Sequence, residues 1–144
     1  MNIAILLPLK EKYTSIGCGA VSILVNTHLK KSKYKKTTRI YGSNIRNPLD
    51  PDSFRPLVAN KNFFSNLSYV NSFEKQIFPK TDIIELHNRP KYFFQLKKKF
   101  PDKKFILFFH NDPLDQTGSI TLNDRKFLYE KVDKLVFLSV WMKD

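Results

Sequence analysis

The stretch TDIIELHNRPKYFFQLKKKFPDKKFILFFHNDP, residues 81–113, decides the fold class, because it contains an apolar strand, an amphipathic helix and a second apolar strand in succession. The two strands, expected at residues 82–86 and 105–109, are apolar along their length instead of alternating between apolar and polar residues. Apolar strands of this kind, joined by a helix, are typical of a parallel sheet covered on both faces. Pro90 suits the first turn of the helix, and Pro101 ends it.

Strands and helices also alternate through the rest of the chain. The pattern predicts further strands at residues 2–7, 37–41, 67–70 and 135–138, and a loop at residues 47–56, which contain three prolines. It predicts helices at residues 21–29, from Asn71, from Thr121 to about Lys131, and from 139 to 144. An α/β fold follows, with one Rossmann-like domain over residues 1–144 and an open parallel sheet that carries helices on both faces.

The composition limits what the chain can be. Its 144 residues are 42% hydrophobic and include 13 Phe, 6 Tyr and 1 Trp, which is enough for the core of one domain. The single cysteine, Cys18, excludes a disulfide framework and a zinc site built from several thiolates. The longest apolar runs fall far short of the ~20 residues that span a bilayer, and no basic segment precedes Ile3 as in a signal peptide. We therefore expect a soluble, cytoplasmic domain.

The chain is strongly basic, with 25 Lys and Arg against 13 Asp and Glu and a net charge of +12. Two interpretations remain open. In the first, a composition biased towards Lys, Asn, Ile, Phe and Tyr leaves a solvated lysine surface that has no function. In the second, the lysines form a basic face that binds an anionic partner. An anionic membrane surface is the partner that we expect in the second case, with Tyr92 and Phe94 as the inserting aromatics. The lysines that cluster after the first helix are Lys30, Lys31, Lys33, Lys35 and Lys36.

Polar residues are concentrated where the predicted strands end. In an open parallel sheet, ligands bind beyond the carboxyl ends of the strands, so these residues are expected to meet at one edge. The candidates are Gly17 and Gly19 after the first strand, His87, Asn88 and Arg89 after residues 82–86, His110 and Asn111 after residues 105–109, and Ser139 after the last strand. The third histidine, His28, is predicted to lie on the apolar face of its helix as a structural residue.

The glycine loop and the histidines do not specify a cofactor. Backbone N–H groups at the start of a helix can cradle a phosphate, and residues 17–22 (GCGAVS) nearly match the dinucleotide fingerprint. However, these glycines lie ten residues beyond the first strand, and the second strand ends in YGSN (41–44) without the acidic residue that binds a ribose. The spacing of His87 and His110 demands no metal. We therefore expect neither a nicotinamide cofactor nor a metal ion.

Five blocks occur in a characteristic order: NIAILLPL (2–9), IGCGAVSILVNTHL (16–29), TDIIELHNRP (81–90), FILFFHNDP (105–113) and KVDKLVFLSVWMKD (131–144). As an ordered set they resemble the N-terminal domain of retaining glycosyltransferases with the GT-B fold, of the family-4 type. The resemblance implies that the chain is the acceptor-side half of a GT-B fold. It also implies a second, donor-binding domain after Asp144, whose Glu-x7-Glu motif is absent from this chain because no two glutamates lie eight positions apart.

The resemblance implies roles for single residues. His110 matches the histidine that faces the donor sugar in such enzymes, and it is the implied catalytic residue. Gly19 matches the loop near the donor diphosphate or the acceptor, although Cys18 replaces the first of the family's adjacent glycines. His87 matches a polar position on the acceptor side, and Ser139 matches the serine that closes the last strand. Catalysis would retain configuration without a metal, through positioning and electrostatics.

The implied function is the transfer of a sugar from a nucleotide-sugar donor to a glycan or a lipid-linked acceptor, as in the synthesis of cell-envelope polysaccharides. Because the donor-binding half is missing, this chain alone is expected to be inactive. The alternative is a basic Rossmann-like module that binds a nucleotide or a nucleic acid without catalysis. The presence of only five arginines argues against nucleic acid. A degenerate interaction domain without catalysis is a further alternative.

Overall fold

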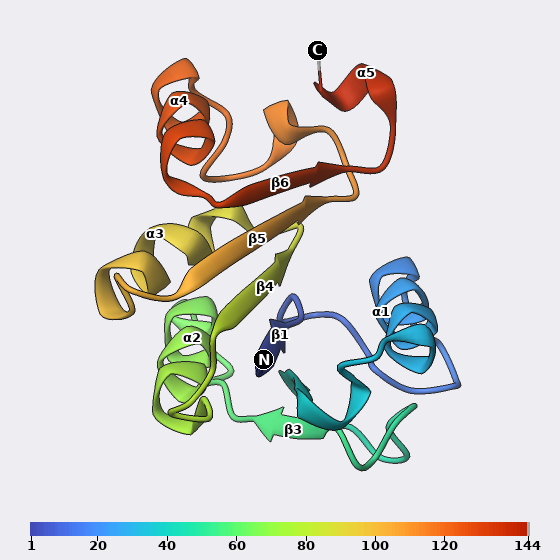
Figure 1. The fold of residues 1–144 in the computed structure, drawn as a ribbon. Helices are drawn as coiled ribbons and strands as arrows, with labels where there is room; N and C mark the ends of the chain where they lie inside the picture. Colours follow the sequence, from blue (N-terminus) through green and yellow to red (C-terminus); the bar gives the residue numbers. More distant parts are fainter. Residues whose placement is uncertain (144) are drawn as a thin grey trace.

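A single parallel sheet forms the centre of the molecule in a computed structural model that describes residues 1–143 (Figure 1). Its strand order is β3-β2-β1-β4-β5-β6, and all five neighbouring pairs are parallel. The strands are β1 (Ile3–Leu6), β2 (Thr38–Ser43), β3 (Phe54–Leu57), β4 (Ile83–His87), β5 (Lys104–Phe109) and β6 (Lys134–Phe137). The predicted α/β class, with an open parallel Rossmann-like sheet, is confirmed.

Helices pack on both faces of the sheet (Figure 1). α1 (Ala20–Lys31) covers one face, and α2 (Ser65–Gln76), α3 (Pro90–Lys99) and α4 (Leu122–Lys131) cover the other. Short helical turns are η1 (Lys35–Thr37), η2 (Pro113–Asp115) and α5 (Val140–Lys143). The last predicted helix reaches Asp144, which lies outside the described residues. No helix in residues 1–143 has the length and apolar character needed to cross a bilayer.

Aromatic side chains dominate the larger core, between the sheet and α2, α3 and α4. The ring of Phe93 on α3 is fully buried and meets Phe105 of β5 edge-to-face, with 5.2 Å between centroids. Tyr41 of β2 meets Phe73 of α2 in the same way at 5.0 Å. Edge-to-face pairs of this kind add about 0.5–1.5 kcal/mol each beyond the burial of their area. This packing fixes the three helices against the sheet and thereby the loops that precede them.

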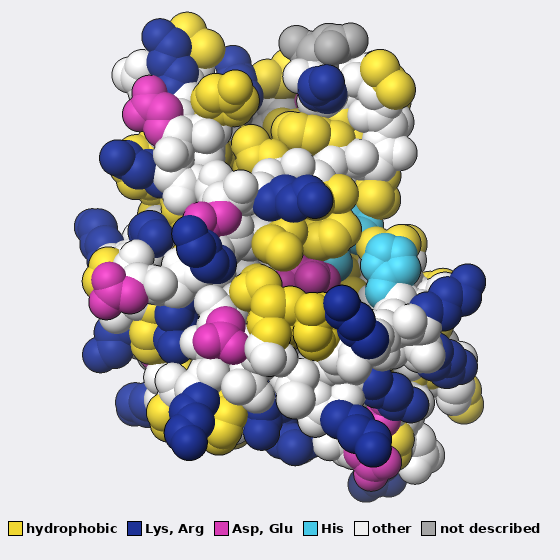
Figure 2. All heavy atoms as spheres, in the orientation of Figure 1, with side chains coloured by type: hydrophobic (Ala, Val, Ile, Leu, Met, Phe, Trp, Pro, Cys, Tyr) yellow, Lys and Arg dark blue, Asp and Glu magenta, His cyan; other side chains and the backbone are white. Residues whose placement is uncertain are grey.

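The second face of the sheet is only partly covered by the described residues. The smaller core joins α1 to the first three strands, with Val25 and Leu29 of the helix packed in one cluster with Ile5 and Ile40. Further along the sheet, the side chains of β4 to β6 that point to this face are only half-buried or exposed, His87 excepted. Figure 2 shows them as a hydrophobic area at the centre of the view, with acidic and histidine side chains beside it. This open face adjoins the candidate site.

Three sequence-based predictions were wrong, each because a neighbouring element decides the local structure. A loop was predicted at residues 47–56, but its last three residues belong to the edge strand β3 (Phe54–Leu57). Pro56 is tolerated there because one side of an edge strand needs no donor. Residues 67–70 were predicted as a strand, and a helix was predicted to begin at Asn71. They belong instead to α2, whose buried residues Tyr69, Val70 and Phe73 follow helical spacing.

His28 also departs from its prediction. Its side chain is exposed, because the buried face of α1 is formed by Val21, Ser22, Val25 and Leu29. By contrast, the predicted cap of α4 is confirmed, since Oγ1 of Thr121 accepts a hydrogen bond from the backbone N–H of Asp124 at 3.1 Å. Pro90 occupies the first turn of α3 as predicted.

Candidate functional site

The candidate site lies where the chain changes direction across the sheet. β1 and β4 are neighbours, but the connection after β1 leads to β2 on one side, and the connection after β4 leads to β5 on the other. In open parallel sheets, such a switch point leaves a crevice at the carboxyl ends of the strands, and ligands bind there. The loop with Gly17 and Gly19 follows β1, and His87 ends β4. Sequence and topology therefore place these predicted residues at the same edge.

The two histidines of this edge are in direct contact. Nδ1 of His87 lies 2.9 Å from Nε2 of His110, and Nε2 of His87 lies 2.7 Å from Oε1 of Glu85. Glu85 and His87 are two residues apart on β4, so they share one face of the strand. His87 is only 1% exposed, and its ring stacks on Phe108 with 4.6 Å between centroids. A carboxylate and two imidazoles thus form a continuous hydrogen-bonded row.

Burial makes His110 a neutral imidazole at physiological pH. Removal from water, followed by the repulsion that a charged His87 exerts, lowers the pKa of His110 to about 4. The carboxylates of Glu11 and Glu85 favour the charged form but do not offset burial. Nδ1 of His110 has no hydrogen-bond partner in residues 1–143, and it is not among the atoms buried away from solvent. That nitrogen is therefore the atom that a ligand can reach.

The glycine loop surrounds a carboxylate of the protein itself. Oε1 of Glu11 accepts a hydrogen bond from the backbone N–H of Ser22 at 2.9 Å, in the first turn of α1. A Cβ on Gly19 would lie 2.5 Å from the same oxygen, so the glycine makes room for Glu11. Helix N-termini attract anions, and here the anion is already in place. The predicted phosphate position is filled, and a phosphate can bind there only if Glu11 moves away.

Asn88 ties together the loops that follow β4 and β5. Its backbone adopts a φ of 55°, and its Oδ1 accepts a hydrogen bond from Nε2 of Gln116 at 2.6 Å. The backbone N–H groups of His110 and Asn111 donate to the same oxygen, both at 3.3 Å. Asn88 is buried, so its role in this structure is to hold His110 in place.

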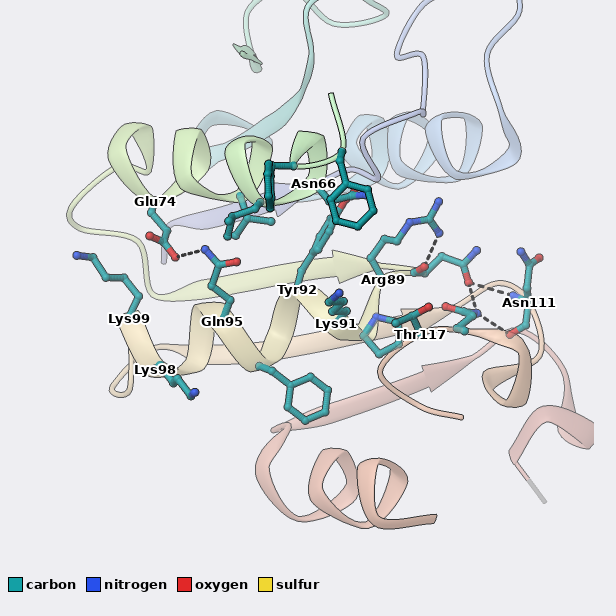
Figure 3. Close-up of a pocket in the computed structure, with 18 of the residues that line it drawn as sticks. Asn66, Glu74, Arg89, Lys91, Tyr92, Gln95, Lys98, Lys99, Asn111 and Thr117 are labelled. Atoms are coloured by element: carbon teal, nitrogen blue, oxygen red, sulfur yellow. Dashed lines mark hydrogen bonds between the residues drawn. The ribbon is translucent and has the colours of Figure 1, made fainter. Parts of the chain in front are cut away.

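Three predicted site residues line a groove that does not include the histidines. Asn88, Arg89 and Asn111 line an open groove of about 1230 Å³ along α2 and α3 (Figure 3). Figure 3 shows Arg89 and Asn111 towards one end of the groove and Lys98 and Lys99 towards the other. Neither His87 nor His110 is among the residues that line this groove. The structure therefore divides the predicted set between the histidine row and the groove along α2 and α3.

Tyr92 and Phe94, the aromatics predicted to insert into a membrane, are not the most exposed aromatics at this groove. Tyr92 is buried, and its hydroxyl donates a hydrogen bond to Oδ1 of Asn66 at 2.8 Å. Phe94 stacks on Phe127 with 5.2 Å between centroids. The aromatic side chains exposed at the groove are Phe63 and Phe64 instead, which are 94% and 58% exposed.

Ser139 is the remaining predicted site residue, and it follows β6. Its Oγ is buried without a hydrogen-bond partner in residues 1–143, and no hydrogen bond joins it to the histidines.

Glu11, Glu85 and Gln116 were not predicted as site residues. Glu85 could have been found from its spacing, because Glu-x-His on a strand places both side chains on one face. Glu11 and Gln116 act through contacts across the fold that no local pattern contains.

The described residues contain no cluster of three or more His, Cys, Asp or Glu side chains arranged to hold a metal ion. Comparison of the chain with protein-family models, with curated protein sequences and with solved structures gives no match. The function therefore has to be argued from the geometry of the site and from the sequence resemblance.

Proposed function

We propose that this chain is the acceptor-side domain of a retaining glycosyltransferase of the GT-B type, which transfers a sugar from a nucleotide-sugar donor to a glycan or a lipid-linked acceptor. The observation that carries the proposal is the row formed by Glu85, His87 and His110 beside the switch point between β1 and β4. A neutral imidazole held at this edge suits a hydroxyl-rich ligand, because it forms hydrogen bonds without bringing a charge.

The residues of this chain would act by positioning. His110 would hold a sugar hydroxyl, and Asn88 would fix the backbone of His110 through its hydrogen bond to that N–H group. The groove along α2 and α3, with its lysines and exposed aromatics, would face the membrane that carries a lipid-linked acceptor. Holding two reactants in a near-attack geometry removes much of the entropic barrier to a bimolecular reaction. The nucleotide-sugar diphosphate would be bound by the second domain that the resemblance implies.

An anionic membrane surface is the partner that we propose for the groove side of the molecule. Phe63 and Phe64 are adjacent, highly exposed and preceded by Lys61, while Lys98 and Lys99 line the groove behind them. Aromatic side chains insert at the membrane interface, and each nearby lysine adds about 1 kcal/mol at an anionic surface. This arrangement suits access to a lipid-linked acceptor from the cytoplasmic side.

Binding measured by NMR tests the proposed function. The ¹⁵N-labelled chain is titrated with methyl glycosides and, separately, with nucleotide sugars. We expect methyl glycosides to shift the signals of His87, His110 and Asn88, and His110→Ala to abolish these shifts while His28→Ala, at an exposed position, preserves them. The isolated chain should not turn over any nucleotide sugar. Turnover by this chain alone would overturn the assignment as a half-enzyme, and tighter binding of a DNA duplex at the same residues would support the nucleic-acid alternative.

A further inference from the structure

The contacts among Glu85, His87 and His110 restrict where the protons of this row can lie. An ionised carboxylate only accepts hydrogen bonds, so the 2.7 Å contact with Glu85 requires a hydrogen on Nε2 of His87. A neutral imidazole carries hydrogen on one nitrogen, so Nδ1 of His87 is an acceptor. Its 2.9 Å contact with His110 therefore requires the hydrogen of His110 on Nε2. Nδ1 of His110, the nitrogen that solvent reaches, is left as a bare lone pair.

We infer that Glu85 and His87 are positioning residues that hold His110 as its Nε2–H tautomer, so that Nδ1 of His110 binds the hydroxyl group of a ligand and rejects phosphate oxygens. A lone pair attracts an O–H hydrogen, whereas a phosphate oxygen brings a second acceptor to the same point. The inference rests on the proposed function only for the statement that the hydroxyl belongs to a sugar.

The surroundings of His87 keep its ring from turning over and so keep Nε2 on Glu85 and Nδ1 on His110. The ring is almost fully buried and stacked on Phe108 with an interplanar angle of 17°. Turning the ring would separate Nε2 from Glu85 and Nδ1 from His110 in the buried interior, and unpaired buried polar groups are unfavourable. Burial also lowers the pKa of His110, which keeps that ring neutral while it binds. Both effects favour a single tautomer.

Imidazole ¹⁵N chemical shifts test the inference without any sugar, so it can fail while the proposed function stands. At pH 7.5 we expect His87 and His110 each to show one protonated Nε2 and one bare Nδ1, while the exposed His28 shows the averaged tautomers of a free ring. Sulfate, whose oxygens carry no hydrogen at pH 7.5, should leave the His110 signals unchanged.

Two matched variants test whether Glu85 fixes the tautomers of His87 and His110. Glu85→Gln keeps the shape but can donate as well as accept, so the single tautomers of His87 and His110 should become mixtures. Glu11→Gln removes the other nearby charge without touching the row, so the tautomers should stay as they are. A protonated Nδ1 of His110 in the native chain at pH 7.5, or unchanged tautomers in a folded Glu85→Gln variant, would overturn the inference. If Glu85→Gln does not fold, the tautomers of the native chain decide the question by themselves.

Discussion

The side-chain amide of Gln116 donates a hydrogen bond to Oδ1 of Asn88 at 2.6 Å, and both side chains are buried. This contact joins the segment after β5 to the end of β4, 28 residues earlier in the chain. The same oxygen accepts from the backbone N–H of His110, so the position of the exposed imidazole depends on Asn88. The position of the candidate site therefore depends on two buried side chains outside the histidine row.

Asn88 has two structural roles, a backbone with positive φ and a side-chain acceptor for buried donors, and two substitutions should separate them. Asn88→Gly keeps the positive φ but leaves buried donors without an acceptor, so the free energy of unfolding should fall by about 1–3 kcal/mol. Asn88→Ala should cost about 1–2 kcal/mol more, because alanine also resists this backbone conformation. Urea unfolding followed by circular dichroism measures both. Equal stability of the two variants would show that the positive φ carries no strain for alanine.

Two glycines with positive φ form a second matched pair. Gly118 has a φ of 99°, and a Cβ there would lie 2.6 Å from the backbone nitrogen of Lys91. Gly17 has a φ of 72° and nothing within 4 Å of a Cβ. Backbone strain should lower the free energy of unfolding by about 1–2 kcal/mol in both alanine variants. Overpacking should lower it by about 1–3 kcal/mol more in Gly118→Ala. Thermal unfolding should therefore show a clearly larger loss for Gly118→Ala, and a reversed order would contradict the packing at α3.

The stability of the chain should depend on pH through His110. The pKa of His110 is lowered from 6.5 to about 4 by burial and by His87. Between these values the unfolded chain binds more protons than the folded chain, so the free energy of unfolding should fall as the pH falls from 6.5 towards 4. His110→Asn should make this fall less steep than in the native chain. Urea midpoints measured across this range check both slopes.

The proposed membrane surface predicts a specific loss of vesicle binding. Replacement of Phe63 and Phe64 by serine should reduce co-sedimentation with anionic vesicles, because the inserting rings are removed while the charge stays the same. Tyr129→Ser on α4 is the control, since that side chain is 80% exposed but lies outside the groove. Binding should rise with anionic lipid and fall with salt. Equal binding by all three proteins would leave the lysines as the sole attraction and contradict insertion.

Glu11 gives a prediction about the first turn of α1. Glu11→Ala leaves the N–H of Ser22 without its partner and removes a negative charge from a helix N-terminus, which should cost about 1 kcal/mol of stability. Glu11→Gln keeps an acceptor and should cost less. Phosphate should not raise the melting temperature of the native chain, because the carboxylate occupies this position. Stabilisation of the native chain by phosphate, lost with Gly19→Ala, would show that Glu11 yields its place to a ligand.

Most of the fold could be predicted from local patterns. Apolar runs identified β1, β4 and β5, and the Thr121 cap and Pro90 identified the starts of two helices. The edge strand β3 escaped because its pairing with β2 is contributed by distant residues, such as Phe54 with Ile40, and its own sequence contains a proline. Residues 67–70 were misjudged because a short apolar run has no distinguishable period.

The site was predictable only in part, for a related reason. Strand ends can be read from the sequence, so His87 and His110 were expected at one edge. Which of two successive residues turns to which face depends on the exact end of each strand, and this separates Asn88 and Asn111 from the histidines. The contact between Glu11 and Ser22 in the first turn of α1 joins residues 11 positions apart, and its geometry is set by tertiary packing that no spacing rule describes.

The central place of β1 determines when this chain can finish folding. β1 precedes both of its partners in the chain, since Ile3 pairs with Thr38 on one side and with Ile83 on the other. During translation β1 can join β2 early, but its second edge stays unpaired until β4 has been made. An apolar strand with a free edge is a template for pairing with other chains. Nascent chains halted before β4 should therefore aggregate more readily than chains with the finished sheet, in which β1 is paired on both sides.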